Sequence, residues 1–70
     1  MLVALQRVLP NTRGGNVSIT DQGKVIINTD KIIQINELSD LGLMEINLDG
    51  SDEVLYTTIK EFESKIKYVN

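Results

Sequence analysis

The chain has 70 residues, no cysteine, no histidine and a formal net charge of −3. This length allows one small domain over residues 1–70, and the missing residue types exclude disulfides, thiolate metal sites and the commonest general base. The acidic balance disfavours contact with a phosphate backbone, so we expect no nucleic-acid partner.

Charge is uneven along the chain. Residues 1–35 carry four basic and two acidic side chains, whereas residues 36–70 carry three basic and eight acidic ones. An anionic ligand would therefore have to bind locally, in the first half. The same asymmetry would also favour contact between opposite poles of neighbouring subunits.

Apolar residues make up 41% of the chain, and nine residues are isoleucine. A domain of this size buries only about 60% of the surface of its unfolded chain, so a core without a crosslink is marginal. We therefore expect homo-oligomerisation, in which a second copy completes the hydrophobic core.

No segment has the features of a secretion signal or a membrane span. Residues 1–9 are too short for a signal and are interrupted by Gln6 and Arg7. No run approaches the roughly 18 apolar residues that a membrane helix needs. Because the lack of cysteine is typical of a reducing compartment, we expect a cytoplasmic protein.

The first elements are predicted as strands. Residues 2–9 match both strand alternation and helical spacing. We favour a strand, because β-rich segments follow and need a partner, and we expect Pro10 to end it. Residues 16–20 and 24–28 are then two strands, separated by a turn at Asp21–Gly23.

Two further strands are predicted at residues 31–37 and 43–48. The Asp-Gly signal predicts a hairpin turn at residues 49–52, with the return strand at residues 53–57. Strand alternation predicts which apolar residues share a face of the sheet. These sets are Val17 with Ile19, Val25 with Ile27, Ile33 with Ile35, and Met44 with Ile46 and Leu48. Ile32 is expected on the face opposite to Ile33 and Ile35.

A C-terminal helix is predicted because apolar residues recur at steps of three and four: Ile59, Phe62, Ile66 and Val69. Thr58 and Glu61 have the spacing of a capping box at its start. The helix cannot bury its apolar stripe alone, so it must cover a sheet. The expected fold is α+β, a small antiparallel β meander of about five short strands with one C-terminal helix.

Residues 26–67 resemble the small FlbD-type flagellar proteins. Their pattern is an Asn-x-Asp turn, an apolar strand ending in an acid, a hairpin with a glycine, and a capped terminal helix. The residues that match this pattern are Asn28, Asp30, Ile32, Ile35, Gly50, Val54, Leu55, Thr58, Ile59, Glu61 and Phe62. LytTR-type DNA-binding domains and many small phage proteins share a looser version. The FlbD resemblance implies an adaptor that docks to a larger protein assembly.

The segment NTRGGN, residues 11–16, is the best candidate for a binding site. Consecutive glycines let backbone amides converge on an anion, and a guanidinium can bind phosphate through two hydrogen bonds. The expected ligand-binding residues are Arg7, Asn11, Arg13, Gly14, Gly15 and Asn16. In the alternative interpretation, the segment is a solvated hairpin tip in which glycine supplies only turn geometry.

Catalysis and metal binding have no strong candidate in the sequence. Asp49, Ser51 and Glu53 have the alternate spacing of calcium ligands, but the loop has Val54 and Lys60 where an EF-hand requires glycine and glutamate. No hydroxyl has a neighbouring base that would activate it. We therefore expect a non-enzyme with no metal and no cofactor.

Two functions remain open. The first is a non-catalytic, homo-oligomeric binding module that captures or sequesters a small anionic ligand such as a nucleotide, a description that a small phage protein would fit. The second is an FlbD-like flagellar or other protein–protein adaptor, in which the helix and the acidic hairpin dock to a partner.

Overall fold

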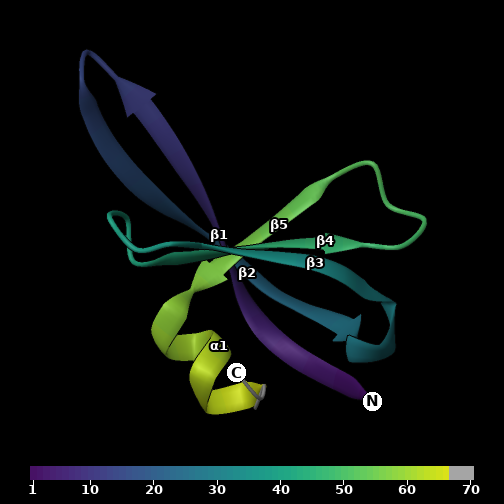
Figure 1. Cartoon of the computed structure of the whole chain (residues 1–70). Helices are drawn as coiled ribbons and strands as arrows, with labels where there is room; N and C mark the ends of the chain where they lie inside the picture. Colours follow the sequence, from purple (N-terminus) through teal and green to yellow (C-terminus); the bar gives the residue numbers. More distant parts are fainter. Residues whose placement is uncertain (67–70) are drawn as a thin grey trace.

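In the computed structural model, which describes residues 1–66, five antiparallel strands form one sheet that is followed by one helix (Figure 1). The elements are β1 (Leu2–Arg13), β2 (Asn16–Asn28), a 3-10 turn (Thr29–Lys31), β3 (Ile32–Leu38), β4 (Leu43–Leu48), β5 (Val54–Thr58) and α1 (Ile59–Lys65). The predicted α+β class is confirmed. No helix in this part of the chain is long and apolar enough to cross a membrane.

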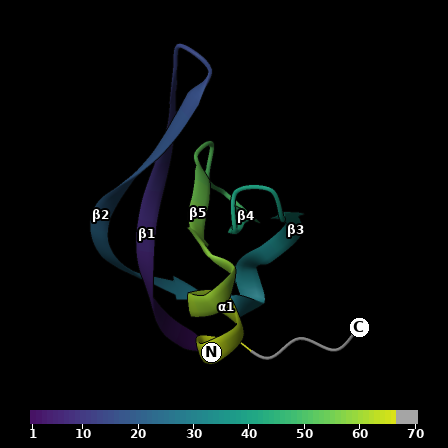
Figure 2. The same ribbon diagram turned by 90° about the vertical axis from the view of Figure 1, so that its left-hand side faces the viewer.

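The sheet combines a hairpin with a three-stranded meander. The strand order is β2-β1-β5-β4-β3, so the first and last strands in sequence are neighbours at the centre. β1 meets β5 in the ladder at Val8 and Tyr56. Figure 2 shows β1 and β2 curving away from the other three strands. The hairpin is therefore attached to the meander over a short length.

The predicted first strand is present, but its predicted end at Pro10 is wrong. β1 continues to Arg13, and Pro10 lies opposite Ile19 of β2. Counting back from the two-residue turn at residues 14–15, Pro10 occupies a pair without backbone hydrogen bonds, so its nitrogen points away from β2. A proline is tolerated here because no hydrogen bond of the ladder with β2 is lost.

The predicted turn at Asp21–Gly23 is also wrong, because β2 is continuous through it. Between two successive ladder pairs, β2 contains one residue more than β1, which is a β-bulge. Gly23 has φ +82°, and its amide donates to Asp21 Oδ1 at 2.7 Å. The turn-forming residues bend the strand without ending it.

The core lies where α1 packs against the sheet. Its buried members are Leu5, Ile27, Met44, Ile46, Leu55, Phe62 and Ile66. Phe62 is fully buried, which confirms the predicted apolar stripe of the helix as far as Ile66. Val69, the last predicted member of the stripe, lies outside the described residues.

The predicted face of β3 is wrong. Ile32 and Ile35 both pack against the core, whereas Ile33 is 68% exposed. Between the ladder pairs Ile32–Leu48 and Gln34–Asn47, β3 contains one residue more than β4. This bulge interrupts the alternation at Ile33, so Ile32 and Ile35 face the core although they are three residues apart.

Two side chains hold β1 where its ladder with β5 stops. The Thr57 hydroxyl donates to the backbone carbonyl oxygen of Gln6 at 2.7 Å, and the backbone amide of Gln6 donates to Glu61 Oε2 at 2.9 Å. The Glu61 amide in turn donates to Thr58 Oγ1 at 3.0 Å, so the predicted helix cap is confirmed. In place of the reciprocal half of the capping box, the Glu61 carboxylate accepts the hydrogen bond from the Gln6 backbone amide of β1.

Candidate functional site

The distal parts of β1 and β2 form a two-stranded arm, residues 9–20, that projects from the body of the molecule away from α1 (Figure 1). Every residue of this arm except Pro10, which is half-buried, is exposed. The predicted site residues Asn11, Arg13 and Asn16 are therefore all accessible to a ligand. An isolated two-stranded ribbon is only marginally stable in water, so the arm gains from any contact that covers it.

The tip of the arm is a two-residue hairpin turn. Gly14 has φ +58° and Gly15 has φ +85°, and Arg13 is paired with Asn16 across the turn. Two consecutive positive φ values define a type I′ turn and explain both glycines. An anion-binding nest instead alternates right- and left-handed residues, so these two amides do not converge as a nest. Any anion at the tip would depend on side chains.

The predicted side chains share one side of β1. Strand alternation puts Arg7, Asn11 and Arg13 on the same face. Asn11 Nδ2 donates to Thr20 Oγ1 at 3.1 Å, so Thr20 of β2 lies on the same face as Asn11. We call this the polar face of the arm; it also carries Asn16 and Ser18. Arg7 lies six residues from Arg13, roughly 20 Å along the strand, so it is not part of the tip.

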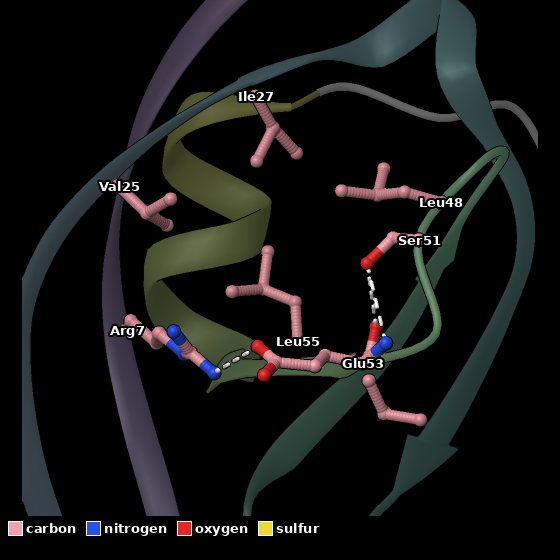
Figure 3. A pocket seen from close by; sticks show the side chains of 8 residues that line it. Arg7, Val25, Ile27, Leu48, Ser51, Glu53 and Leu55 are labelled. Carbon is pink, nitrogen blue, oxygen red and sulfur yellow. Dashed lines mark hydrogen bonds and ion pairs between the residues drawn. The ribbon is translucent and has the colours of Figure 1, made fainter.

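Arg7 instead stands at the rim of a small cavity of about 130 Å³ (Figure 3). The cavity is lined by Arg7, Val25, Ile27, Leu48, Ser51, Glu53, Val54 and Leu55. Arg7 Nη2 lies 3.5 Å from Glu53 Oε2. Because the Glu53 side chain is 80% exposed, this ion pair is weak. Sequence reasoning missed the cavity, since its walls come from four strands and a loop.

Arg13 is in a different electrostatic situation. Within residues 1–66, the ion pairs are those of Arg7 with Glu53 and of the N-terminal amine with Asp30. No carboxylate of that part of the chain lies within ion-pair distance of Arg13. The Arg13 guanidinium is thus an exposed cation that an anion can approach without displacing a carboxylate.

Tyr56 lies on the opposite side of the sheet from the core residue Leu55. Its hydroxyl donates to Glu45 Oε2 at 3.2 Å, and Asn36 Nδ2 donates to Glu45 Oε1 at 2.9 Å. Burial raises the pKa of Tyr56, and the hydrogen bond to Glu45 and the negative charge of Glu45 raise it further. The phenol therefore stays protonated near neutral pH and acts as a hydrogen-bond donor.

In residues 1–66, no three carboxylates come together in a group that could hold a metal ion. Comparison of the chain with protein-family models, with curated proteins and with solved structures gives no match. The resemblance to FlbD-type and LytTR-type proteins stays a prediction from sequence.

Proposed function

We propose that this protein is a cytoplasmic, non-catalytic, homo-oligomeric binding module that captures a small anionic ligand such as a nucleotide. The observation that supports it most directly is the exposed Arg13, which has no ion-pair partner in the described residues and lies at the end of a projecting arm. Asn11 and Asn16 flank it on the polar face and supply amide groups.

The chemistry of capture would depend on few groups. A guanidinium binds phosphate through two parallel charge-assisted hydrogen bonds, and an asparagine amide both donates and accepts hydrogen bonds with a base or sugar. One such arm gives weak binding. In a symmetric oligomer each subunit presents its own arm, so the assembly carries one such group of side chains per subunit. Arg7 lies too far from Arg13 to share a small anion with it within one chain.

Thermal unfolding with a panel of nucleoside mono-, di- and triphosphates tests this proposal. A ligand that binds only the folded state adds about 2.7 kcal/mol at a hundred times its dissociation constant, so the melting temperature rises. Arg13→Ala should abolish the rise. Arg7→Ala removes an equal charge beside the cavity, far from the tip, and should keep most of the rise in melting temperature. Melting temperatures that no member of the panel changes would contradict ligand capture.

The second candidate is a protein–protein adaptor. It is favoured by Leu2 and Ile26, two large apolar side chains on the neighbouring strands β1 and β2 that are 71% and 69% exposed. Exposed apolar surface of this kind is typical of interaction sites when its members are contiguous. A wild-type protein and an Arg13→Ala variant that both ignore the nucleotide panel would leave the adaptor as the better explanation.

A further inference from the structure

The outer face of β2, which points away from the core, has an unusual sequence of exposed side chains. In chain order this outer β2 face consists of Val17, Ile19, Asp21, Lys24, Ile26 and Asn28. The β-bulge leaves the residues before it and the residues after it on the same side of β2. Lys24 is paired with Gln6, and the Gln6 side-chain amide donates to Asp21 Oδ1. All of these residues except Asn28, which is half-buried, are exposed.

Read in the reverse direction, this face complements itself. A half-turn about a point between Asp21 and Lys24 exchanges these two opposite charges and exchanges Ile19 with Ile26. Two-fold symmetric interfaces require this property, because the same patch of each copy must fit its own rotated image. The match extends over the four inner positions; the outermost pair, Val17 with Asn28, brings an apolar side chain onto a polar one.

We propose that a second copy of this chain packs its outer β2 face on this one in antiparallel orientation. Ile19 of each copy then lies against Ile26 of the other, and each Asp21 faces a Lys24. This inference rests on the proposed homo-oligomer and identifies its surface. The apolar contact covers side chains that are 46% and 69% exposed in a single chain, and removing this area from water drives the association.

The charges at the centre set the orientation of the two copies. In the antiparallel arrangement, two Asp21–Lys24 pairs form; in a parallel arrangement, like charges would lie opposite each other and repel. Leu2, which is 71% exposed, is next to Asn28 on the same side of the hairpin and extends the apolar surface. The polar face of the arm, with Arg13, points the other way and stays open to a ligand.

Mass measurement by light scattering and sedimentation equilibrium tests this interface. Ile26→Glu should weaken the dimer about a hundredfold, because it puts an unpaired carboxylate into the apolar contact twice per dimer. Ile33→Glu is the matched control: it adds the same charge at an isoleucine that is 68% exposed, against 69% for Ile26, and it lies on β3 outside the surface. The control should assemble like the wild type.

Crosslinking gives a second measurement, which reports which residues of the two copies lie together and not how tightly the copies bind. The chain has no cysteine, so Ile19→Cys combined with Ile26→Cys introduces the only thiols. These positions lie roughly 20 Å apart along one strand, which prevents a bond within a chain. Packed sheet faces lie about 10 Å apart, so a short bismaleimide that joins two thiols over this distance should give a covalent dimer. Ile19→Cys combined with Ile33→Cys should give little; equal dimer from both pairs would overturn the proposed surface.

The outcomes separate this inference from the broader proposal. If the wild type assembles but Ile26→Glu has the same mass as the wild type, the surface is wrong and the homo-oligomer stands. A wild type that stays monomeric throughout the concentration range would overturn both. Ligand capture is judged independently, by the nucleotide melts of Arg13→Ala.

Discussion

Thr57 shows how a single residue compensates for a break in the sheet. It is fully buried, although it is polar, and its hydroxyl donates to the Gln6 carbonyl oxygen at 2.7 Å. The ladder between β1 and β5 is formed at Val8 and Tyr56, one residue from Thr57 on β5 and two from Gln6 on β1. The threonine side chain therefore supplies a hydrogen bond that the diverging backbones cannot make with each other.

We expect Thr57→Val to lower the free energy of unfolding by about 1–3 kcal/mol. Valine has nearly the same shape, but it leaves the Gln6 carbonyl oxygen without its donor in a part-buried position. Urea unfolding at a fixed protein concentration measures the loss. Thr57→Ser keeps the hydroxyl and removes one methyl group, which costs about 0.8 kcal/mol. A valine variant that is more stable than the serine variant would show that the hydrogen bond contributes little.

At the level of elements, α1 depends on its contacts with the sheet. A helix of seven residues is too short to be stable alone in water. It is held by the cap at Thr58, by the burial of Phe62 and by the bond from Glu61 to β1. Glu61 thus connects the last element of the chain to the first strand.

We expect Glu61→Ala to destabilise the fold by about 1–3 kcal/mol, because the Gln6 amide loses a charged acceptor. Glu61→Gln keeps an oxygen acceptor and should cost less. Glu63→Ala, at an exposed position of the same helix, should change stability by less than about 0.5 kcal/mol. Hydrogen exchange adds a local readout: faster exchange of the Gln6 amide in Glu61→Ala is expected, and unchanged exchange would contradict the role of this bond.

As a whole molecule, the protein is more extended than a compact chain of its length. Its radius of gyration is 12.0 Å and its extents are 39 × 25 × 19 Å, whereas about 11 Å is expected for 70 residues. The arm accounts for the long dimension, and it exposes Val17 and Ile19. A small core with an exposed apolar arm is the physical basis of the proposed self-association.

The proposed dimer predicts that stability depends on protein concentration. If folded dimers dissociate as they unfold, mass action raises the melting temperature with concentration. For a dimer of this size, the rise should be about 5 °C for each tenfold increase. Calorimetry or circular dichroism over two decades of concentration measures it. Ile26→Glu should lose most of this dependence and Ile33→Glu should keep it; a wild type whose melting temperature is constant would contradict the dimer.

The sequence alone was sufficient where a signal acts over a few residues. Strand alternation outside β3, the glycine pair at the tip, the Asp-Gly turn and the helix stripe with its Thr58 cap were predicted, since each depends on neighbours in the chain. The accessible position of the NTRGGN segment followed from the same local signals.

Only the tertiary structure decided what depends on partners distant in sequence. Pro10 and the Asp21–Gly23 segment look like breaks in a strand, but whether they end it depends on which backbone groups the neighbouring strand uses. The bulge at Ile33 depends likewise on the register with β4. The outer β2 face follows from this pairing, because register decides which side of a sheet each residue occupies. The separation of Arg7 from Arg13 follows from the continuation of β1 through Pro10.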